Sequence, residues 1–215
     1  MLVFEAKALL FDMDGTLIDS SQSVFLAWQA WCAETGANLD EVLRICQGTP
    51  CRQTIRAVAP HLDLVREVAR YEALEHGFDG GQQAFLGAES ILTGLPQGCW
   101  AWVTSAAEVV ARHRVSRCGL SFRRSAGTSE SVWDGKPAPD PFLYGAHQLG
   151  VAPEDCIVFE DSPAGVEAAL AAGCRVIVVG DAVSLRPGVL TRIKDYAGMQ
   201  VVHEPGQGVR VTIPA

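Results

Sequence analysis

The amino-acid sequence predicts an α/β fold, a doubly wound, Rossmann-like parallel sheet core with an inserted α-helical cap domain. Over most of the chain, short apolar runs alternate with helix-length segments, a pattern typical of a parallel sheet with helices on both faces. Residues 19–88 differ because they contain consecutive helical patterns without a clear strand. We therefore expect a core of residues 1–18 and 89–215 and a cap of residues 19–88.

The expected strands are short and almost continuously apolar, which is typical of strands that are buried on both faces. They are predicted at Ala8–Phe11, Trp100–Val103, Ile157–Phe159 and Arg175–Val179, and as a closing hairpin at Gln200–His203 and Val209–Ile213. Each helix of the core precedes a glycine, the residue that most often follows the last turn of a helix. These helices are predicted at Ala107–Cys118, Pro139–Leu149 and Ala164–Ala172.

The composition is that of an ordinary globular protein with an acidic balance. The 215 residues include 17 Lys and Arg against 25 Asp and Glu, which leaves a net charge of −8. An acidic chain has no broad attraction for nucleic acid or an anionic membrane, so any phosphate site must be local. The sequence shows no secretory signal and no apolar stretch approaching the ~20 residues of a membrane span. We expect a cytoplasmic protein, a monomer or weak homodimer, without nucleic-acid or membrane partners.

Two aspartates, Asp12 and Asp14, directly follow the first predicted strand. Residues two apart on an extended segment point to the same side, so their carboxylates should lie together. The carboxyl ends of parallel strands are where open α/β sheets bind ligands. Gly15 then permits a tight turn. A solvated loop can show the same pair of aspartates, so the chemistry depends on what the other strands carry.

The other predicted strands also end in polar groups suited to phosphate chemistry. Thr104 and Ser105 follow one strand, Glu160 and Asp161 follow another, and Lys136 precedes a proline-rich helix start. An acidic pair suits a hard divalent cation, which prefers oxygen ligands. A nucleophile, an acid/base, a cation and a metal site together predict phosphoryl transfer.

Four motifs, in this order and spacing, resemble those of the haloacid dehalogenase (HAD) superfamily of phosphotransferases. They are FDMDGTLIDS (Phe11–Ser20), VTS (Val103–Ser105), GKP (Gly135–Pro137) and FEDSPAGVEAALAAG (Phe159–Gly173). The helical insert resembles the cap of the β-phosphoglucomutase-like branch. Within that branch, the sequence is most similar in appearance to small sugar phosphatases and glycerol-phosphate phosphatases.

The resemblance implies a role for each motif residue. Asp12 would attack phosphorus and become an aspartyl phosphate, and Asp14 would protonate the leaving alcohol and then activate water. Mg²⁺ would be bound by the Asp12 carboxylate, the Asp14 carbonyl and Asp161, with Glu160 as a direct ligand or a neighbour of the ligands. The transferring phosphoryl group would be held by Thr104, Lys136 and the backbone amides of Met13 and Ser105.

The cap is expected to choose the substrate. Its glycine-led loop, QGTPCRQTIR, contains Gly48 at the position that relatives share, and Arg52 is its nearest basic residue. Arg52 is expected either to touch the substrate or to lie on a solvated helix face. Other arginines, also interpreted as a solvated helix face, are Arg112, Arg114 and Arg117, with Arg123 and Arg124 just beyond.

These observations predict Mg²⁺-dependent hydrolysis of a small phosphate monoester, a sugar or polyol phosphate, through an aspartyl-phosphate intermediate. Cleavage of a carbon–halogen bond is disfavoured, because the resemblance places no second aspartate in dehalogenases and Asp14 is present here. Two alternatives stay open. One is a sugar-phosphate mutase of the β-phosphoglucomutase type, which would use the same residues, and the other is an inactive metabolite-binding module.

Overall fold

Six parallel strands form the central sheet of the protein. The computed structural model describes residues 1–78, 80–96, 98–122 and 125–214. Across the sheet, the strands are β6 (Ser125–Gly127), β5 (Trp100–Val103), β2 (Ala8–Phe11), β7 (Cys156–Glu160), β8 (Arg175–Val179) and β9 (Val189–Ile193). The prediction of β2, β5, β7 and β8 is confirmed. Because β2 pairs with both β5 and β7, the two aspartates that follow it lie at the middle of one sheet edge.

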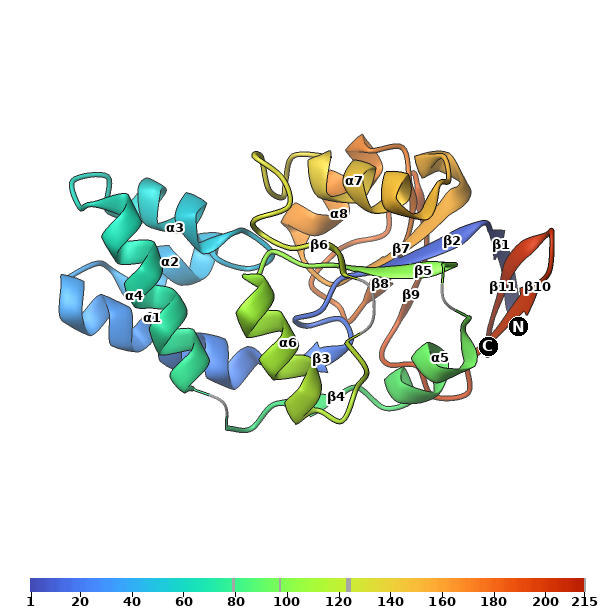
Figure 1. Cartoon of the computed structure of the whole chain (residues 1–215), viewed down its shortest axis with the longest axis horizontal. Coiled ribbons are helices and arrows are strands. Elements are labelled where there is room, and N and C mark those ends of the chain that lie inside the picture. The colour runs from blue at the N-terminus through green and yellow to red at the C-terminus, as the bar shows by residue number, and fades with distance from the viewer. Residues whose placement is uncertain (79, 97, 123–124, 215) are drawn as a thin grey trace.

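Helices cover both faces of this sheet, which confirms the doubly wound fold (Figure 1). Along β2, Leu9 and Phe11 pack on one face with α5 (Ala88–Gly94) and α6 (Glu108–Arg117). On the other face, Ala8 and Leu10 pack with α7 (Asp140–Leu149) and α8 (Pro163–Ala171). Both faces of the strand are apolar because each is covered, which is why its sequence is an unbroken apolar run.

The ends of the core helices agree with the predicted glycine positions. Gly119, Gly150 and Gly173 follow α6, α7 and α8 with φ values of 70°, 70° and 88°. This left-handed conformation is accessible to glycine at little cost and stops the helix. A short 3₁₀ helix, η1 (Pro153–Asp155), leads into β7.

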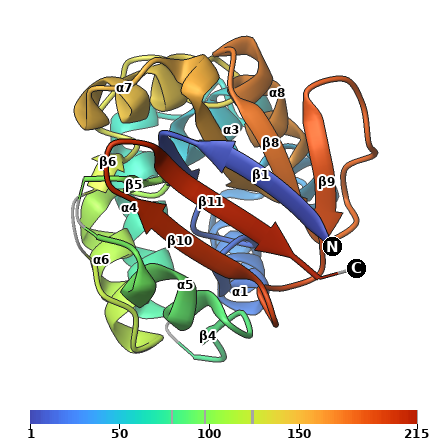
Figure 2. The same cartoon turned by 90° about the vertical axis from the view of Figure 1, so that its right-hand side faces the viewer.

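A separate antiparallel ribbon packs at the end of the core that is remote from the cap (Figure 2). It consists of β1 (Leu2–Ala6), β11 (Gly208–Ile213) and β10 (Gln200–Glu204) in that order. The predicted hairpin of β10 and β11 is confirmed, but β1 was not predicted from the sequence. Most of β1 is exposed or half-buried, so its composition does not mark a separate buried strand.

Four helices form a second cluster beside the sheet, at the left of Figure 1. These are α1 (Ser21–Thr35), α2 (Leu39–Ile45), α3 (Cys51–Val58) and α4 (Leu64–Gly77), here called the cap helices. They have their own apolar core around Trp31, Ile55 and Tyr71. The chain passes between the two clusters at β3 (Ile18–Asp19) and β4 (Gln83–Ala84), which pair with each other. The division into residues 1–18 and 89–215 against 19–88 stays a proposal.

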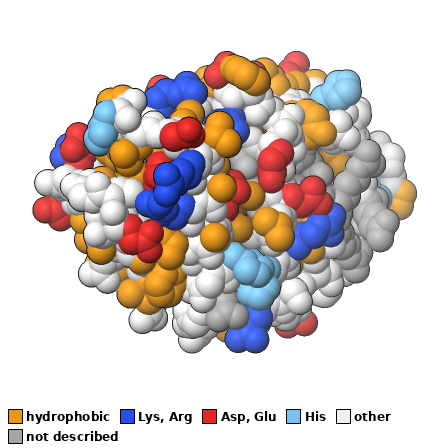
Figure 3. Space-filling view, turned by 60° about the vertical axis from the view of Figure 1, so that its left-hand side comes forward, with side chains coloured by type: hydrophobic (Ala, Val, Ile, Leu, Met, Phe, Trp, Pro, Cys, Tyr) orange, Lys and Arg blue, Asp and Glu red, His pale blue; other side chains and the backbone are white. Residues whose placement is uncertain are grey.

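The cysteines form no disulfides among themselves, and the surface carries side chains of mixed type (Figure 3). All seven cysteines are free, and Cys156 and Cys174 are buried in the core. Acidic, basic and apolar side chains are interspersed over the face shown in Figure 3. Of the helices described, none has the length and apolar character needed to cross a bilayer.

Candidate active site

A buried ion-pair cluster lies at the end of β2. The Asp12 backbone N–H donates to the Phe159 carbonyl (3.0 Å), which fixes Asp12 beside β7. Lys136 is fully buried, and its Nζ donates to Asp12 Oδ1 (2.5 Å), Glu160 Oε1 (2.8 Å) and the Val103 carbonyl (3.1 Å). Three motifs that are far apart in sequence therefore converge on one ammonium group.

The charges in this cluster depend on each other. Burial raises the pKa of the Asp12 carboxyl, Lys136 opposes this, and Glu160 and Asp161 raise it further, so it lies well above its ordinary value. Burial lowers the pKa of Lys136, but the charges of Asp12 and Glu160 outweigh burial and raise it above its usual range. Lys136 thus stays protonated and offsets the repulsion among the carboxylates.

Three carboxylates are close enough to share one cation. Oxygen atoms of Asp12, Glu160 and Asp161 lie within 4.8 Å of one another. Burial, followed by the charge of Glu160, raises the pKa of Asp161 to about 7, although hydrogen bonds from Gln47 and Thr16 lower it. An all-oxygen donor set in which the carboxylates repel each other fits a hard divalent cation such as Mg²⁺.

Two glycines make room for these carboxylates. Gly15 has φ 78°, and a Cβ there would lie 2.1 Å from Asp161 Oδ2. A Cβ at Gly165 would lie 1.6 Å from Glu160 Oε1. Glu160 sits over the first turn of α8, where it accepts from the backbone N–H (2.7 Å) and Oγ (2.9 Å) of Ser162. Any side chain at either glycine would displace an acidic group of the site.

The hydroxyl residues that follow β5 are also in place. Thr104 is buried, and its Oγ1 accepts from the Ala106 N–H at 3.1 Å. Ser105 Oγ donates to the Gly48 carbonyl at 2.8 Å, so the loop after β5 contacts the cap directly. Gln47, a residue that was not predicted to belong to the site, donates through Nε2 to Asp161 Oδ2 at 3.2 Å. The cap loop thus reaches the cluster of carboxylates.

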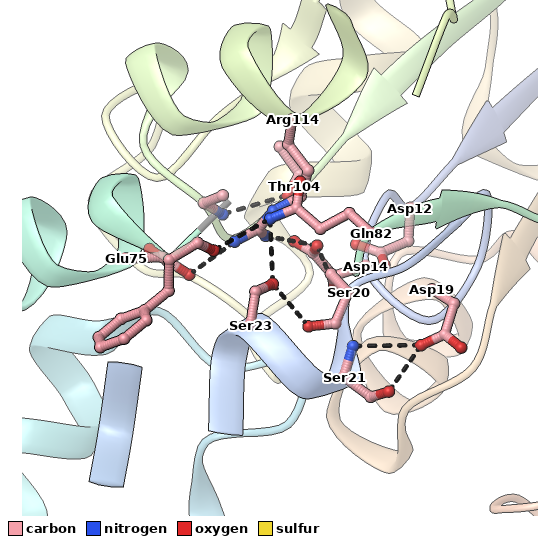
Figure 4. A network of polar contacts seen from close by, with 12 residues as sticks. Asp12, Asp14, Asp19, Ser20, Ser21, Ser23, Glu75, Gln82, Thr104 and Arg114 are labelled. Carbon is pink, nitrogen blue, oxygen red and sulfur yellow. Dashed lines mark hydrogen bonds and ion pairs between the residues drawn. The ribbon is translucent and has the colours of Figure 1, made fainter. Parts of the chain in front are cut away.

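Asp14 contacts Ser20 and Arg114 (Figure 4), whereas Asp12 pairs with Lys136. Ser20 Oγ donates to Asp14 Oδ1 at 2.5 Å, and Arg114 Nη1 donates to the same oxygen. Arg114 Nη2 donates to Oε1 of Glu75 on α4 at 3.3 Å. A core helix, the loop after β2 and a cap helix therefore meet at one guanidinium group.

This network corrects the interpretation of the α6 arginines as a solvated face. Arg114 is only 1% exposed, because it falls on the same side of α6 as the buried Val110, Ala111 and Val115. Spacings of three and four residues from apolar positions were the signal that could have identified it. Arg112 is more exposed and pairs with Glu108 at 2.6 Å. Arg123 and Arg124 lie outside the described residues.

A cavity of about 560 Å³ opens between the core and the cap helices. Its walls include several of the predicted site residues, namely Asp12, Asp14, Gly48, Thr104, Ser105 and Asp161. Glu160 and Lys136 are fully buried behind them. Met13 is also fully buried, so it can offer only its backbone to a ligand.

Arg52 was predicted as a candidate for substrate contact, but it does not line the cavity. Its guanidinium donates to the carbonyls of Ser129 (2.6 Å), Val132 (3.3 Å) and Trp133 (2.6 Å), in the loop before Lys136. The described contacts make Arg52 a bridge from α3 to the core.

Comparisons with known proteins agree with this geometry. A family model described as haloacid dehalogenase-like hydrolase matches residues 9–179. Hexitol phosphatase A of Escherichia coli (strain K12) is 41% identical over 181 residues, 80% of this chain and 82% of the relative. Glycerol-1-phosphate phosphohydrolase 2 of Saccharomyces cerevisiae is 30% identical and is aligned over 82% of this chain and 75% of the relative. The structure of CbbY from Rhodobacter sphaeroides in complex with phosphate matches with a TM-score of 0.74 at 21% identity, covering 90% of this chain and 96% of that one.

Proposed function

The chain belongs to the haloacid dehalogenase-like hydrolase family, and from that premise we propose that it hydrolyses small sugar or polyol phosphate monoesters. The observation that carries the proposal is the position of Asp12. Its carboxylate lines an open cavity while Lys136 and two further carboxylates surround it. Such a group can serve as a nucleophile toward phosphorus while the lysine and a bound cation balance the charge.

The names of the relatives support the substrate class. Hexitol phosphatase A and glycerol-1-phosphate phosphohydrolase 2 are named for polyol phosphates, and a 29% identical relative is the fructose-1-phosphate phosphatase YqaB of Escherichia coli (strain K12). A cavity of about 560 Å³ is large enough for an ester of this size. A cytoplasmic location and a monomer or weak homodimer stay predictions.

In the proposed reaction, Asp12 attacks phosphorus and forms an acyl phosphate while the bond from phosphorus to the alcohol oxygen breaks. Asp14 donates its proton to that oxygen, so the alcohol leaves neutral. A water molecule then attacks the same phosphorus, gives a proton back to Asp14 and releases phosphate and free Asp12. General acid–base help of this kind contributes about 10²–10⁴-fold to a rate.

Other groups of the site hold the phosphoryl group and its charge. We assign this to the Lys136 ammonium, the Thr104 hydroxyl and the backbone amides of Met13 and Ser105. Mg²⁺, held by Asp12, Asp161 and the Asp14 carbonyl with Glu160 beside them or as a fourth ligand, would neutralise charge that develops on the phosphoryl oxygens. The fit of the carboxylate cluster to a hard cation supports this assignment.

The test is a panel of phosphomonoesters incubated with the purified protein and Mg²⁺, with released phosphate as the readout. Hexitol, hexose and glycerol phosphates should be cleaved, beryllium fluoride should inhibit, and an Asp12→Asn variant should release no phosphate. Conversion of a hexose 1-phosphate to the 6-phosphate without phosphate release would instead identify the mutase alternative. This alternative is tested because the chain is also similar in fold to a β-phosphoglucomutase candidate from Bacteroides vulgatus (26% identity, TM-score 0.70, covering 89% of this chain and 84% of that one).

A further inference from the structure

The half of the cavity that lies against α1 and α4 is acidic and apolar. Its wall there includes Phe25, Trp28, Tyr71, Glu72 and Glu75. Within the described part of the chain, no lysine, arginine or histidine side chain lines any part of the cavity. The alcohol portion of a phosphate ester bound at Asp12 would extend into this half, because the phosphoryl end is fixed at the edge of the sheet.

Two arginines lie near the cavity, but neither offers its charge to it. Arg52 is turned away and occupied by three backbone carbonyls. Arg114 is almost completely buried, and its charge is shared between Asp14 and Glu75. An anionic group on the alcohol portion would therefore meet no unengaged cation among the described residues.

The carboxylates of this half, by contrast, are able to accept hydrogen bonds. Both described donors to Glu75, Tyr71 Oη (3.4 Å) and Arg114 Nη2 (3.3 Å), use Oε1, so Oε2 accepts from no donor in the described structure. Glu72 makes no described hydrogen bond or ion pair. Burial, followed by the charge of Glu130, raises the pKa of Glu72 above its ordinary value.

We propose that this half of the cavity selects phosphate esters whose alcohol is neutral or cationic, that is, polyol and amino-sugar phosphates. Esters whose alcohol carries a carboxylate or a second phosphate are rejected, and Glu72 is the residue that sets this selectivity. The inference rests on the proposed phosphatase function and narrows its substrate class.

The proposed selectivity follows from the fact that an ionised carboxylate can only accept hydrogen bonds. An ionised carboxylate accepts hydrogen bonds from hydroxyl and ammonium groups but has no proton to donate to another carboxylate. Like charges that face each other in a partly enclosed site are strongly unfavourable, so an anionic alcohol is excluded. The stacked rings of Trp28 and Tyr71, with centroids 3.8 Å apart, add an apolar wall against which the carbon chain of a polyol can pack.

The experiment uses pairs of esters that share a carbon skeleton and differ in the charge of one group remote from the phosphate. Glucitol 6-phosphate and 6-phosphogluconate share a six-carbon chain, but one ends in CH₂OH and the other in a carboxylate. Glucose 6-phosphate and glucosamine 6-phosphate differ by the exchange of a hydroxyl for an ammonium group. For the unaltered enzyme, we expect kcat/KM for glucitol 6-phosphate to exceed that for 6-phosphogluconate at least about tenfold. Glucosamine 6-phosphate should be cleaved at least as well as glucose 6-phosphate.

Variants of Glu72 then test its assignment. Glu72→Gln should reduce the ratio of kcat/KM between the two six-carbon esters several-fold, and Glu72→Lys should reduce it further or reverse it. Glu41→Gln removes one charge from an exposed position on α2, outside the cavity wall, and should leave the ratio unchanged. Equal kcat/KM for both esters in the unaltered enzyme, or an unchanged ratio in Glu72→Lys, would overturn the inference. Failure to release phosphate from any ester, p-nitrophenyl phosphate included, would overturn the proposed function and this inference with it.

Discussion

The guanidinium of Arg114 lies between the carboxylates of Asp14 and Glu75, donating through Nη1 to the first and through Nη2 to the second. Asp14 follows the central strand, and Glu75 belongs to a cap helix, so one side chain ties the proposed acid/base to the cap. Burial opposes the charge of Arg114, but Asp14 and Glu75 outweigh it and raise its pKa above the ordinary value. Arg114 is therefore charged and is a positioning residue for Asp14.

Replacement of Arg114 should weaken acid catalysis. Arg114→Met leaves Asp14 without its partner, and we expect kcat to fall about ten- to hundredfold, part of the 10²–10⁴-fold that a positioned acid supplies. The loss should be larger for an alkyl phosphate than for p-nitrophenyl phosphate, whose leaving group needs no proton. Arg112→Met, on the same helix but paired with Glu108, is the control. Equal losses on both esters would make Arg114 merely structural.

Loss of the Asp12 carboxylate should abolish turnover. Asp12→Asn keeps the shape of the side chain, but an amide does not attack phosphorus, so kcat should fall below a few per cent of its original value. Circular dichroism should show an intact fold. Asp14→Asn should retain more activity, reduced by about 10²–10⁴-fold. Substantial turnover by Asp12→Asn would remove Asp12 as the nucleophile.

Loss of the bridge that Arg52 forms between cap and core should raise KM for all substrates alike. Its three hydrogen bonds to the loop at Ser129–Trp133 join the cap to the core. Hydrogen bonds from a charged group are worth about 1.5–3 kcal/mol, so Arg52→Ala should raise KM about tenfold or more for a polyol phosphate and for p-nitrophenyl phosphate. Arg56→Ala, an exposed position on the same helix, is the matched control. A loss confined to the polyol ester would return Arg52 to direct substrate contact, as the sequence analysis expected.

Metal binding should stabilise the protein more at high pH than at low pH. The folded-state pKa of Asp161, about 7, lies above its ordinary value of 3.8. A raised carboxyl pKa stabilises the metal-free fold at pH below about 4, and this contribution is lost as pH rises through about 7. Mg²⁺ binds the ionised Asp161 carboxylate, so its binding should restore folding stability at the pH values, from about 4 to about 7 and above, where the metal-free fold loses it.

The measurement is the change in Tm on adding Mg²⁺, recorded at several pH values. We expect a larger increase at pH 8 than at pH 5, and chelation should reverse it and abolish turnover. Asp161→Asn should flatten the pH dependence. An increase that is independent of pH would contradict a site built from Asp161.

A side chain at Gly165 should disturb the carboxylate cluster. The added Cβ of Gly165→Ala would overlap Glu160 Oε1 and push that carboxylate away from Lys136 and Ser162. Loss of a group that orients metal ligands typically costs 10–100-fold in affinity or activity, so the Mg²⁺ requirement should rise by about that factor. Gly94→Ala, where the added Cβ meets no atom within 4 Å, is the control. An unchanged Mg²⁺ titration for Gly165→Ala would argue against a role for Glu160.

The sequence alone was sufficient to predict the central strands and the convergence of the motifs. β2, β5 and the first four residues of β7 are buried on both faces, so they are unbroken apolar runs. Because parallel strands end at one sheet edge, the polar residues that follow them had to meet there. β9 and β1 were missed because they lie at edges of their sheets and are mostly exposed or half-buried, which allows a mixed composition. β6, a further edge strand, was also missed.

The tertiary structure decided what the two arginines do. Arg52 meets carbonyls 77 to 81 residues further along the chain, and Arg114 meets an aspartate 100 residues before it. The local sequence places Arg52 on a helix and Arg114 on the apolar side of another, but it names a partner for neither. Which partner each arginine finds depends on how the cap sits over the core, and that placement is set by packing between distant segments rather than by periodicity within either one.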